Sequence, residues 1–395
     1  MTIVDTTAET AQHGLKAHSD GGWDRKTPVQ TRSERFTSTN VADFPIVTGR
    51  EANWKFSPIK KLDALLNGEL DGSRTPVTFS DAAGISHEWI ARDDARIGRA
   101  GTPEERGAAN AWSAFGEALL ITVSGEVEST VVVTRDSLGT TARAAHLVIE
   151  SAPFSRGLVI LEHTGDALLS ENVEIVLGDE SKLTVVSVQQ WGDAATHLSS
   201  HYATIGRNAE LTHIVVSLGG ETVRLNPSFH LDHEGAGIEA LGAYFADAGQ
   251  HLEQQVYVDH VSPHTRSRVT YKGALQGEGA RTVWIGDVLI RRSAEGTDSY
   301  EQNRNLVLSP GTRADSIPNL EIETGDIEGA GHASATGRFD DEHLFYLMSR
   351  GISEEESRKL VVRGFLLEVI NQIGHPATEA RLQAAIEAEL EEGVY

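Results

Sequence analysis

The chain has 395 residues, with 58 acidic against 34 basic side chains, a formal net charge of −24 and no cysteine. The missing thiols exclude a disulfide scaffold, a zinc ribbon, a thiolate nucleophile and an iron–sulfur site built from this chain's own ligands. The acidic excess argues against nucleic-acid or membrane partners, since binding phosphate needs clustered lysine and arginine. No signal peptide or membrane span is visible, so we expect a soluble, cytoplasmic protein.

The N-terminal part of the chain is predicted to contain an arm and a short helical region. Residues 1–45 are polar and aperiodic, which is typical of a flexible or loosely docked arm. A helical region is expected over 46–117. Its first helix covers 59–66, where the leucines share one helical face, and the second covers about 103–115, where a proline and two glutamates favour a helix start.

The middle of the chain, residues 118–330, is predicted to be a β-rich core with a repeat. Leu183, Leu211 and Ile238 begin similar apolar runs at intervals of 28 and 27 residues. Two short strands per unit of about 28 residues, without long helices between them, are typical of a solenoid. About 205 residues then form roughly seven coils. A large antiparallel sandwich is the alternative, but the regular period favours a mainly β solenoid.

The C-terminal part, residues 331–395, is predicted to be a small helical domain. One helix begins near Phe339, a second begins at the capping box that Ser353 opens, and a third covers about 378–392. The last predicted strands are followed only by a glycine-rich segment over 324–338. The terminal coil therefore has strand edges to which another subunit can add, which predicts an end-to-end dimer.

Three histidine pairs and one glycine motif are the features most suggestive of ligand binding. On a strand, a pair four residues apart shares a face but lies about 13 Å apart, too far to chelate one ion directly. We therefore prefer solvated or structural roles for the histidines, and a solenoid corner for the glycine motif, which also fits the dinucleotide fingerprint G-x-G-x-x-A. The pairs are His197/His201, His230/His233 and His260/His264, and the motif occupies residues 235–240.

No catalytic constellation stands out, because the paired carboxylates are adjacent in the sequence and no nucleophile motif occurs. Two enzyme classes remain as alternatives to a scaffold. The first is a β-solenoid enzyme similar to polysaccharide lyases, which needs a groove with clustered Asp and Lys or Arg. The second is a dinucleotide-binding enzyme, which rests on residues 235–240 alone.

Several segments share their residues and spacing with one known family. They include the motif around Trp54 at 50–58, the residues Asp259, His260, His264, Ser267, Lys272 and Gly273, and the segments 297–306, 318–322 and 331–352. This pattern closely resembles the SufB/SufD family of iron–sulfur cluster assembly scaffold proteins over about residues 45–375. The length, the Trp54 motif and the absence of cysteine resemble the SufD branch rather than the cysteine-bearing SufB branch.

The resemblance implies a right-handed parallel β-helix with helical ends and a scaffold role without enzymatic activity. It implies pairing with a SufB-like subunit through the end of the β-helix and docking of a SufC-like ABC ATPase on the C-terminal helices. A homodimer is the alternative assembly. It also implies that His332 faces a nascent cluster or iron at the partner interface, and that this chain alone binds no cofactor stably. Many relatives have a cysteine two residues before this histidine, where this chain has Ala330.

Overall fold

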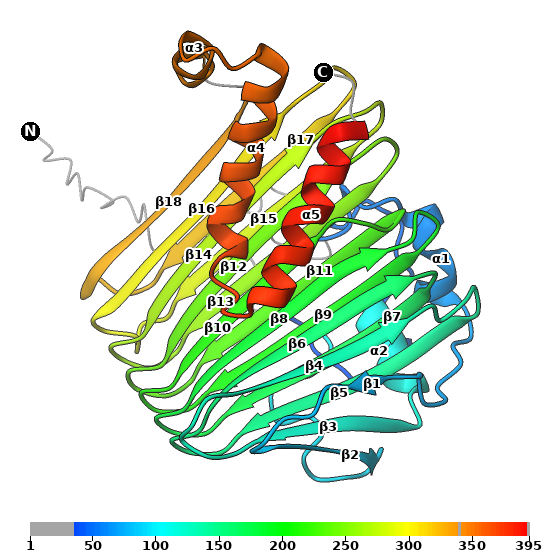
Figure 1. Ribbon diagram of the computed structural model, residues 1–395. Coiled ribbons are helices and arrows are strands. Elements are labelled where there is room, and N and C mark those ends of the chain that lie inside the picture. The colour runs from blue at the N-terminus through cyan, green and yellow to red at the C-terminus, as the bar shows by residue number, and fades with distance from the viewer. Residues whose placement is uncertain (1–34, 339–340, 393–395) are drawn as a thin grey trace, which may run out of the picture.

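A computed structural model describes residues 35–338 and 341–392, and two facing β-sheets form its core (Figure 1). Each sheet has nine strands in the described part of the chain, and from β3 onward consecutive strands alternate between the sheets. Sheet A contains β2 (Ile85–Ala91), β3 (Glu117–Val123), β5 (Ala142–Ser151), β7 (Leu168–Leu177), β9 (Thr196–Ile205), β11 (Thr222–Leu231), β13 (His251–His260), β15 (Arg281–Ile290) and β17 (Arg313–Ile322). Sheet B contains β1 (Thr78–Phe79), β4 (Ser129–Asp136), β6 (Arg156–Gly165), β8 (Lys182–Trp191), β10 (Glu210–Ser217), β12 (Gly237–Ala246), β14 (Arg266–Leu275), β16 (Thr297–Val307) and β18 (Ile327–Gly337).

The strand register confirms the parallel β-solenoid predicted from the repeat. Leu211 pairs with Leu183 on one side and with Ile238 on the other, so the residues that begin the three similar runs stack on each other. All the strand pairs from β3 to β18 are parallel, and only β1 and β2 pair in the antiparallel sense. The sixteen strands from β3 to β18 make eight coils at two strands each, one more than the length suggested.

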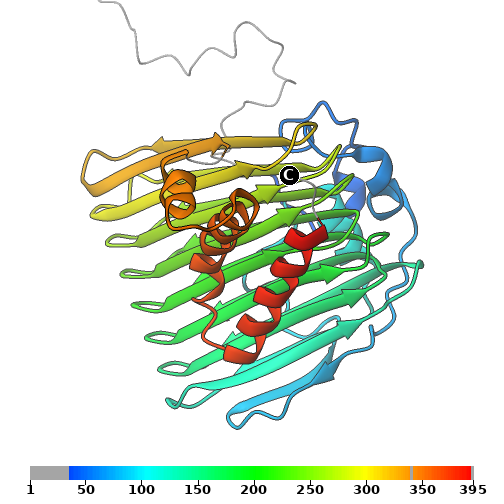
Figure 2. The same cartoon turned by 45° about the horizontal axis from the view of Figure 1, so that its top comes forward.

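Side chains alternate along each strand between the lumen of the solenoid and its outer faces. The lumen is filled by one continuous apolar cluster to which nearly every coil contributes. A second cluster joins the outer face of sheet B to the C-terminal helices, and a third joins the outer face of sheet A to the N-terminal helices. Both outer faces are thus partly covered, and Figure 2 shows the C-terminal helices lying across sheet B.

The predicted helices are present, with small shifts at their ends. They are α1 (Ile59–Asn67), α2 (Arg106–Ala114), α3 (Asp341–Ser349), α4 (Glu354–Ile370) and α5 (Pro376–Glu392). Ser353 caps α4 as its sequence predicts, because its side chain accepts a hydrogen bond from the Glu356 amide. α2 begins three residues later than expected, since Glu105 acts as its cap and accepts from the Ala108 amide. None of the helices in the described ranges is long and apolar enough to cross a membrane.

Three segments differ from the expectation. The helical region expected over 46–117 also contains the strands β1 and β2, because pairing with β4 and β3 extends the two sheets into it. The glycine-rich segment that was expected to connect the last strands to the helices contains β18, so the predicted domain boundary at residue 330 falls inside a strand. Glycine is tolerated there because pairing with β16 supplies the backbone hydrogen bonds. Of the predicted arm over 1–45, residues 1–34 lie outside the described residues. The remainder is docked, since the Ser38 amide donates to the Pro103 carbonyl.

Candidate functional site

His332 lies on β18, the edge strand of sheet B and the last strand of the solenoid (Figure 1). Ala330, two residues earlier, packs against the lumenal core, and alternation along the strand places His332 on the same side. Its side chain is 44% exposed because no further coil covers it. The predicted site residue is therefore positioned at the open end of the lumen, where a partner can reach it.

Glu301 of β16 lies directly beneath His332 in the strand register. Its side chain is 1% exposed, and Nδ1 of His332 is 3.7 Å from Oε1 of Glu301. Within the residues described, neither carboxylate oxygen has a hydrogen-bond partner. Burial, with a smaller contribution from the negative charge of Asp287, raises the pKa of Glu301 to about 8. An imidazole and a desolvated carboxylate thus occupy the end of the lumen together.

The backbone leaves room for this carboxylate at Gly286 on β15. A Cβ atom at this position would overlap both Oε2 of Glu301 and the ring of Trp284. The indole Nε1 of Trp284 also has no hydrogen-bond partner among the described residues. The terminal coils therefore enclose two large side chains whose polar atoms find no hydrogen-bond partner within residues 35–338 and 341–392.

The last two strands are linked across the lumen next to this site. Oγ of Ser334 on β18 and Oγ of Ser316 on β17 form a hydrogen bond of 2.8 Å. On the other side of Ser334, the side chain of Thr336 accepts a hydrogen bond of 3.3 Å from Asn305. These contacts fix β18 against the neighbouring strands, so that the His332 backbone has a defined position without a partner.

The end of the solenoid offers only part of a metal coordination sphere. In the described ranges, no group of three or more His, Asp or Glu side chains has an arrangement that could hold a metal ion. The relatives' cysteine position is occupied by Ala330, which has no donor atom. This chain can therefore supply an imidazole and a carboxylate, and the other ligands of any metal must come from elsewhere.

The histidine pairs lie apart from this site, and their members have separate environments. His197 and His201 are buried in the lumen, where Nδ1 of His197 contacts Gln189 at 2.7 Å and Nδ1 of His201 contacts His213 at 2.9 Å. His260 is also buried and contacts Thr265 and Ser267, at 2.8 and 2.9 Å. The other members of the pairs are His230 on the outer face of sheet A and His233 and His264 in exposed turns.

Residues 235–240 form a corner of the solenoid, as the repeat predicts. Gly235 adopts a φ of +71° in the turn after β11, and Gly237 begins β12. Dinucleotide binding through this motif requires a helix after the turn, whose N-terminus holds the pyrophosphate. Here a strand follows, so the geometry that the fingerprint needs is absent from this segment.

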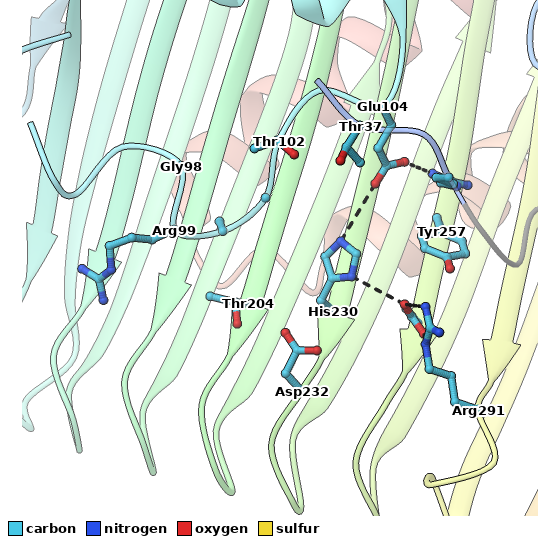
Figure 3. A pocket seen from close by; sticks show the side chains of 14 residues that line it. Thr37, Gly98, Arg99, Thr102, Glu104, Thr204, His230, Asp232, Tyr257 and Arg291 are labelled. Carbon is cyan, nitrogen blue, oxygen red and sulfur yellow. Dashed lines mark hydrogen bonds and ion pairs between the residues drawn. The ribbon is translucent and has the colours of Figure 1, made fainter. Parts of the chain in front are cut away.

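A polar cavity of about 660 Å³ lies on the outer face of sheet A, beside residues 98–104 (Figure 3). His230 lies between Glu104 and Asp259, at 3.9 and 3.8 Å, and Arg291 binds Asp259 through two hydrogen bonds of 2.7 and 2.8 Å. Burial by itself lowers the pKa of His230, but Asp259 and Glu104 outweigh it and raise the pKa. Sequence reasoning missed this cavity, because its residues come from separate segments without a shared motif.

α3 carries an exposed apolar patch. The sequence alone does not show which residues of this helix face outward. Phe345 is 74% exposed, Tyr346 is 57% exposed and Met348 is also exposed. The guanidinium of Arg350 lies 5.0 Å from the centre of the Tyr346 ring. Large exposed aromatic side chains that lie together typically mark an interaction site.

The buried lumenal imidazoles predict a loss of stability in acid. Burial lowers the pKa of His201 to about 4 and that of His260 to about 3. The unfolded chain, in which histidine titrates near 6.5, binds more protons than the folded chain below that pH. We expect the free energy of unfolding to fall as the pH drops from about 6.5 towards 4, by roughly 2 kcal/mol per imidazole at pH 5.

Denaturant unfolding at several pH values measures this effect. H260Q is expected to show a shallower decline between pH 7 and pH 5 than the unmodified chain, since one buried imidazole is gone. H87Q, at an exposed position on β2, is the control and should keep the full decline. An H260Q chain with an unchanged decline would contradict the assignment of acid sensitivity to the lumen.

The fold and this terminal site define a class of protein, a parallel β-solenoid that ends on an open strand edge with a partly exposed histidine beside a buried carboxylate. Residues 132–365 match the family model described as "SUF system FeS cluster assembly, SufBD core domain". An iron–sulfur cluster assembly SufBD family protein of Mycobacterium tuberculosis is 47% identical over 375 residues, which cover 92% of this chain and 94% of that protein. The chain therefore belongs to the SufBD family of iron–sulfur cluster assembly proteins.

Two relatives from Mycobacterium leprae match this chain to different extents. One SufBD family protein is 46% identical over 366 residues, which cover 90% of this chain and 93% of that protein. A second is 28% identical over 211 residues, which cover 53% of this chain and 24% of that protein. The chain is thus similar along its length to one kind of family member and only in part to another, longer kind.

Proposed function

We propose that this chain is a SufD-type scaffold subunit that forms a complex with a SufB-type subunit and a SufC-type ATPase, and that it has no catalytic activity of its own. The position of His332 at the open end of the solenoid carries this proposal, on a chain without cysteine. Imidazole is a suitable iron ligand beside thiolates. In this proposal a nascent cluster is cargo held transiently, its thiolate ligands come from the partner, and no cofactor is bound stably.

The SufB-type partner is proposed to pair with the terminal coil. β17 and β18 are the outermost strands of their sheets, so each has an edge with backbone groups available for pairing. Ile322 of β17 and Tyr300 of β16 are large exposed apolar residues at this end. An apolar edge of this kind suits a second solenoid that adds its own last strands, and a second copy of this chain is the alternative occupant.

The assignment to the SufD type rests on two observations. The chain has no thiol with which to receive sulfur, and its length matches one Mycobacterium leprae relative while it covers only 24% of the other. A pair of family members of different kinds in one organism is consistent with two unlike subunits in one complex. The site of action proposed for this chain is the cytoplasm, where disulfide formation is rare and a partner's thiolates stay reduced.

Co-purification tests the proposed complex. A tagged full-length chain is co-expressed with the SufB- and SufC-type proteins of the same organism, and the captured proteins are identified. We expect both partners to be captured in fixed ratios. Capture of neither partner would contradict the scaffold proposal.

The ATPase is proposed to dock on α3 through Phe345 and Tyr346. The double variant F345A/Y346A is expected to weaken SufC-type binding by about tenfold or more, since exposed aromatic residues often carry most of the energy of an interface. Capture of the SufB-type partner should be unchanged, because that contact lies at the strand edge. F154A is the control, because Phe154 is about as exposed as Tyr346 but lies in a corner of the solenoid. Equal SufC-type binding by both variants would exclude α3 as the dock.

A further inference from the structure

The carboxylate of Glu301 is distinguished from the other buried glutamates by its lack of partners. Glu171 pairs with Arg135, Glu174 accepts from His146 and two backbone amides, and Glu253 pairs with Arg224. Glu301 is as deeply buried, yet neither of its oxygens accepts a hydrogen bond within the ranges that the structure describes. A buried polar group without a partner costs free energy and calls for an explanation.

The geometry of the two side chains fits a shared metal ion. Two ligand atoms that each lie about 2.1 Å from one ion at a tetrahedral angle are about 3.4 Å apart. Nδ1 of His332 and Oε1 of Glu301 are 3.7 Å apart, so a small rotation of either side chain brings both into coordination distance. The two groups also come from neighbouring strands in direct register, and their backbone positions are therefore well defined.

The donor atoms indicate which metal ion the pair favours. A neutral imidazole nitrogen with a carboxylate oxygen suits ferrous iron and similar divalent ions, whereas thiolates favour copper(I) and preformed clusters. The carboxylate occupies the space that Gly286 leaves free, and the imidazole on its other side is partly exposed to solvent. The remaining coordination positions thus point out of the solenoid, towards water or a partner.

We propose that Glu301 and His332 form a two-ligand docking site for a ferrous ion at the open end of the solenoid, with the carboxylate beneath the ion and the imidazole at its rim. This inference deepens the proposed scaffold function and rests on it for the identity of the metal as iron. The carboxylate supplies a negative charge that a lone histidine lacks. Iron can then bind this chain before sulfide or a partner's thiolates complete its coordination.

Titration of the metal-free full-length chain with Co²⁺, an oxygen-stable probe for Fe²⁺, tests the proposal by calorimetry. E301Q and H332A are each expected to weaken the site by at least about tenfold. The loss of affinity in the double variant should be smaller than the sum of the two single losses, because both ligands serve one ion. The Co²⁺ binding that the double variant retains measures the contribution of exposed histidines elsewhere in the chain. E328Q removes an exposed carboxylate from the same strand and should bind as the unmodified chain does.

Thermal unfolding of the same metal-free variants shows whether Glu301 acts as a metal ligand or has a structural role. E301Q is expected to melt at the same or a higher temperature, because the carboxyl oxygens that it replaces accept no hydrogen bond within the described residues. A lower melting temperature, or failure of E301Q to fold, would assign Glu301 a structural role and overturn the proposal. Equal Co²⁺ affinity in E301Q, E328Q and the unmodified chain would also overturn it. Because neither measurement uses a partner, failure here is distinct from failure of the co-purification test.

Discussion

Replacing His332 by alanine is expected to reduce cluster yield in the reconstituted complex by about tenfold or more, while the complex still assembles. The imidazole lies at the rim of the open end, directly above Glu301 in the strand register, and its removal takes away one of the two donors proposed to hold iron there. The fold should persist, because the His332 side chain is 44% exposed and the strand is held by backbone pairing with β16.

Iron and sulfide analysis of the complex, with the ultraviolet–visible spectrum of the cluster, measures this yield. Gel filtration of the same sample shows whether all subunits are present. H233A removes an exposed histidine from a distant corner and is the matched control. A normal cluster yield in H332A would leave His332 as an ordinary histidine of the terminal strand.

Replacing Arg224 by methionine is expected to lower the free energy of unfolding by about 3–5 kcal/mol. The Arg224 side chain is 1% exposed, its Nε lies 3.1 Å from Oε1 of Glu253, and Nη1 lies 3.4 Å from Oε2 of Glu105. Its guanidinium also stacks 3.5 Å from the centre of the Trp54 ring and donates to the Asn53 carbonyl. The substitution leaves the buried carboxylates of Glu105 and Glu253 without their guanidinium partner. It also removes the contacts that hold the segment around Trp54.

Urea unfolding monitored by circular dichroism measures this loss. K182M is the control, since Lys182 forms a pair of 2.6 Å with Glu210 in which both side chains are more than half exposed. Exposed pairs contribute about 0–1 kcal/mol, so K182M should be nearly as stable as the unmodified chain. If R224M lost no more than K182M, Arg224 would not be the residue that joins the N-terminal region to the solenoid.

Much of the architecture was predictable because it repeats locally. A spacing of 27 or 28 residues between Leu183, Leu211 and Ile238 is a property of the linear chain, and parallel stacking converts it directly into register. The cap at Ser353 was predictable for a similar reason, since a cap involves only the first turn of its helix. β18 was not recognised, because its glycines favour a turn locally and its strand conformation depends on pairing with β16.

The candidate site was predictable only in part. His332 was identified from its motif, but the motif does not say that Glu301 lies beneath it. The position of Glu301 beneath His332 depends on how β18 pairs with β16. This pairing includes a register shift after Thr297, which a regular repeat does not predict. The cavity around His230 was equally inaccessible, because it needs Glu104, Asp259 and Arg291 from three separate segments.

The sequence by itself determined the class of this protein, namely an acidic, thiol-free solenoid with helical ends and a family motif at its last coil. These properties follow from composition, from a short repeat and from residues that are neighbours in the chain. Only the tertiary structure decided that the motif's histidine lies beside a buried carboxylate that accepts no hydrogen bond from the described residues, and that the aromatic residues of α3 face outward. Contacts of that kind depend on register and on how separate elements pack, which are set by the burial of the whole lumen rather than by any local pattern.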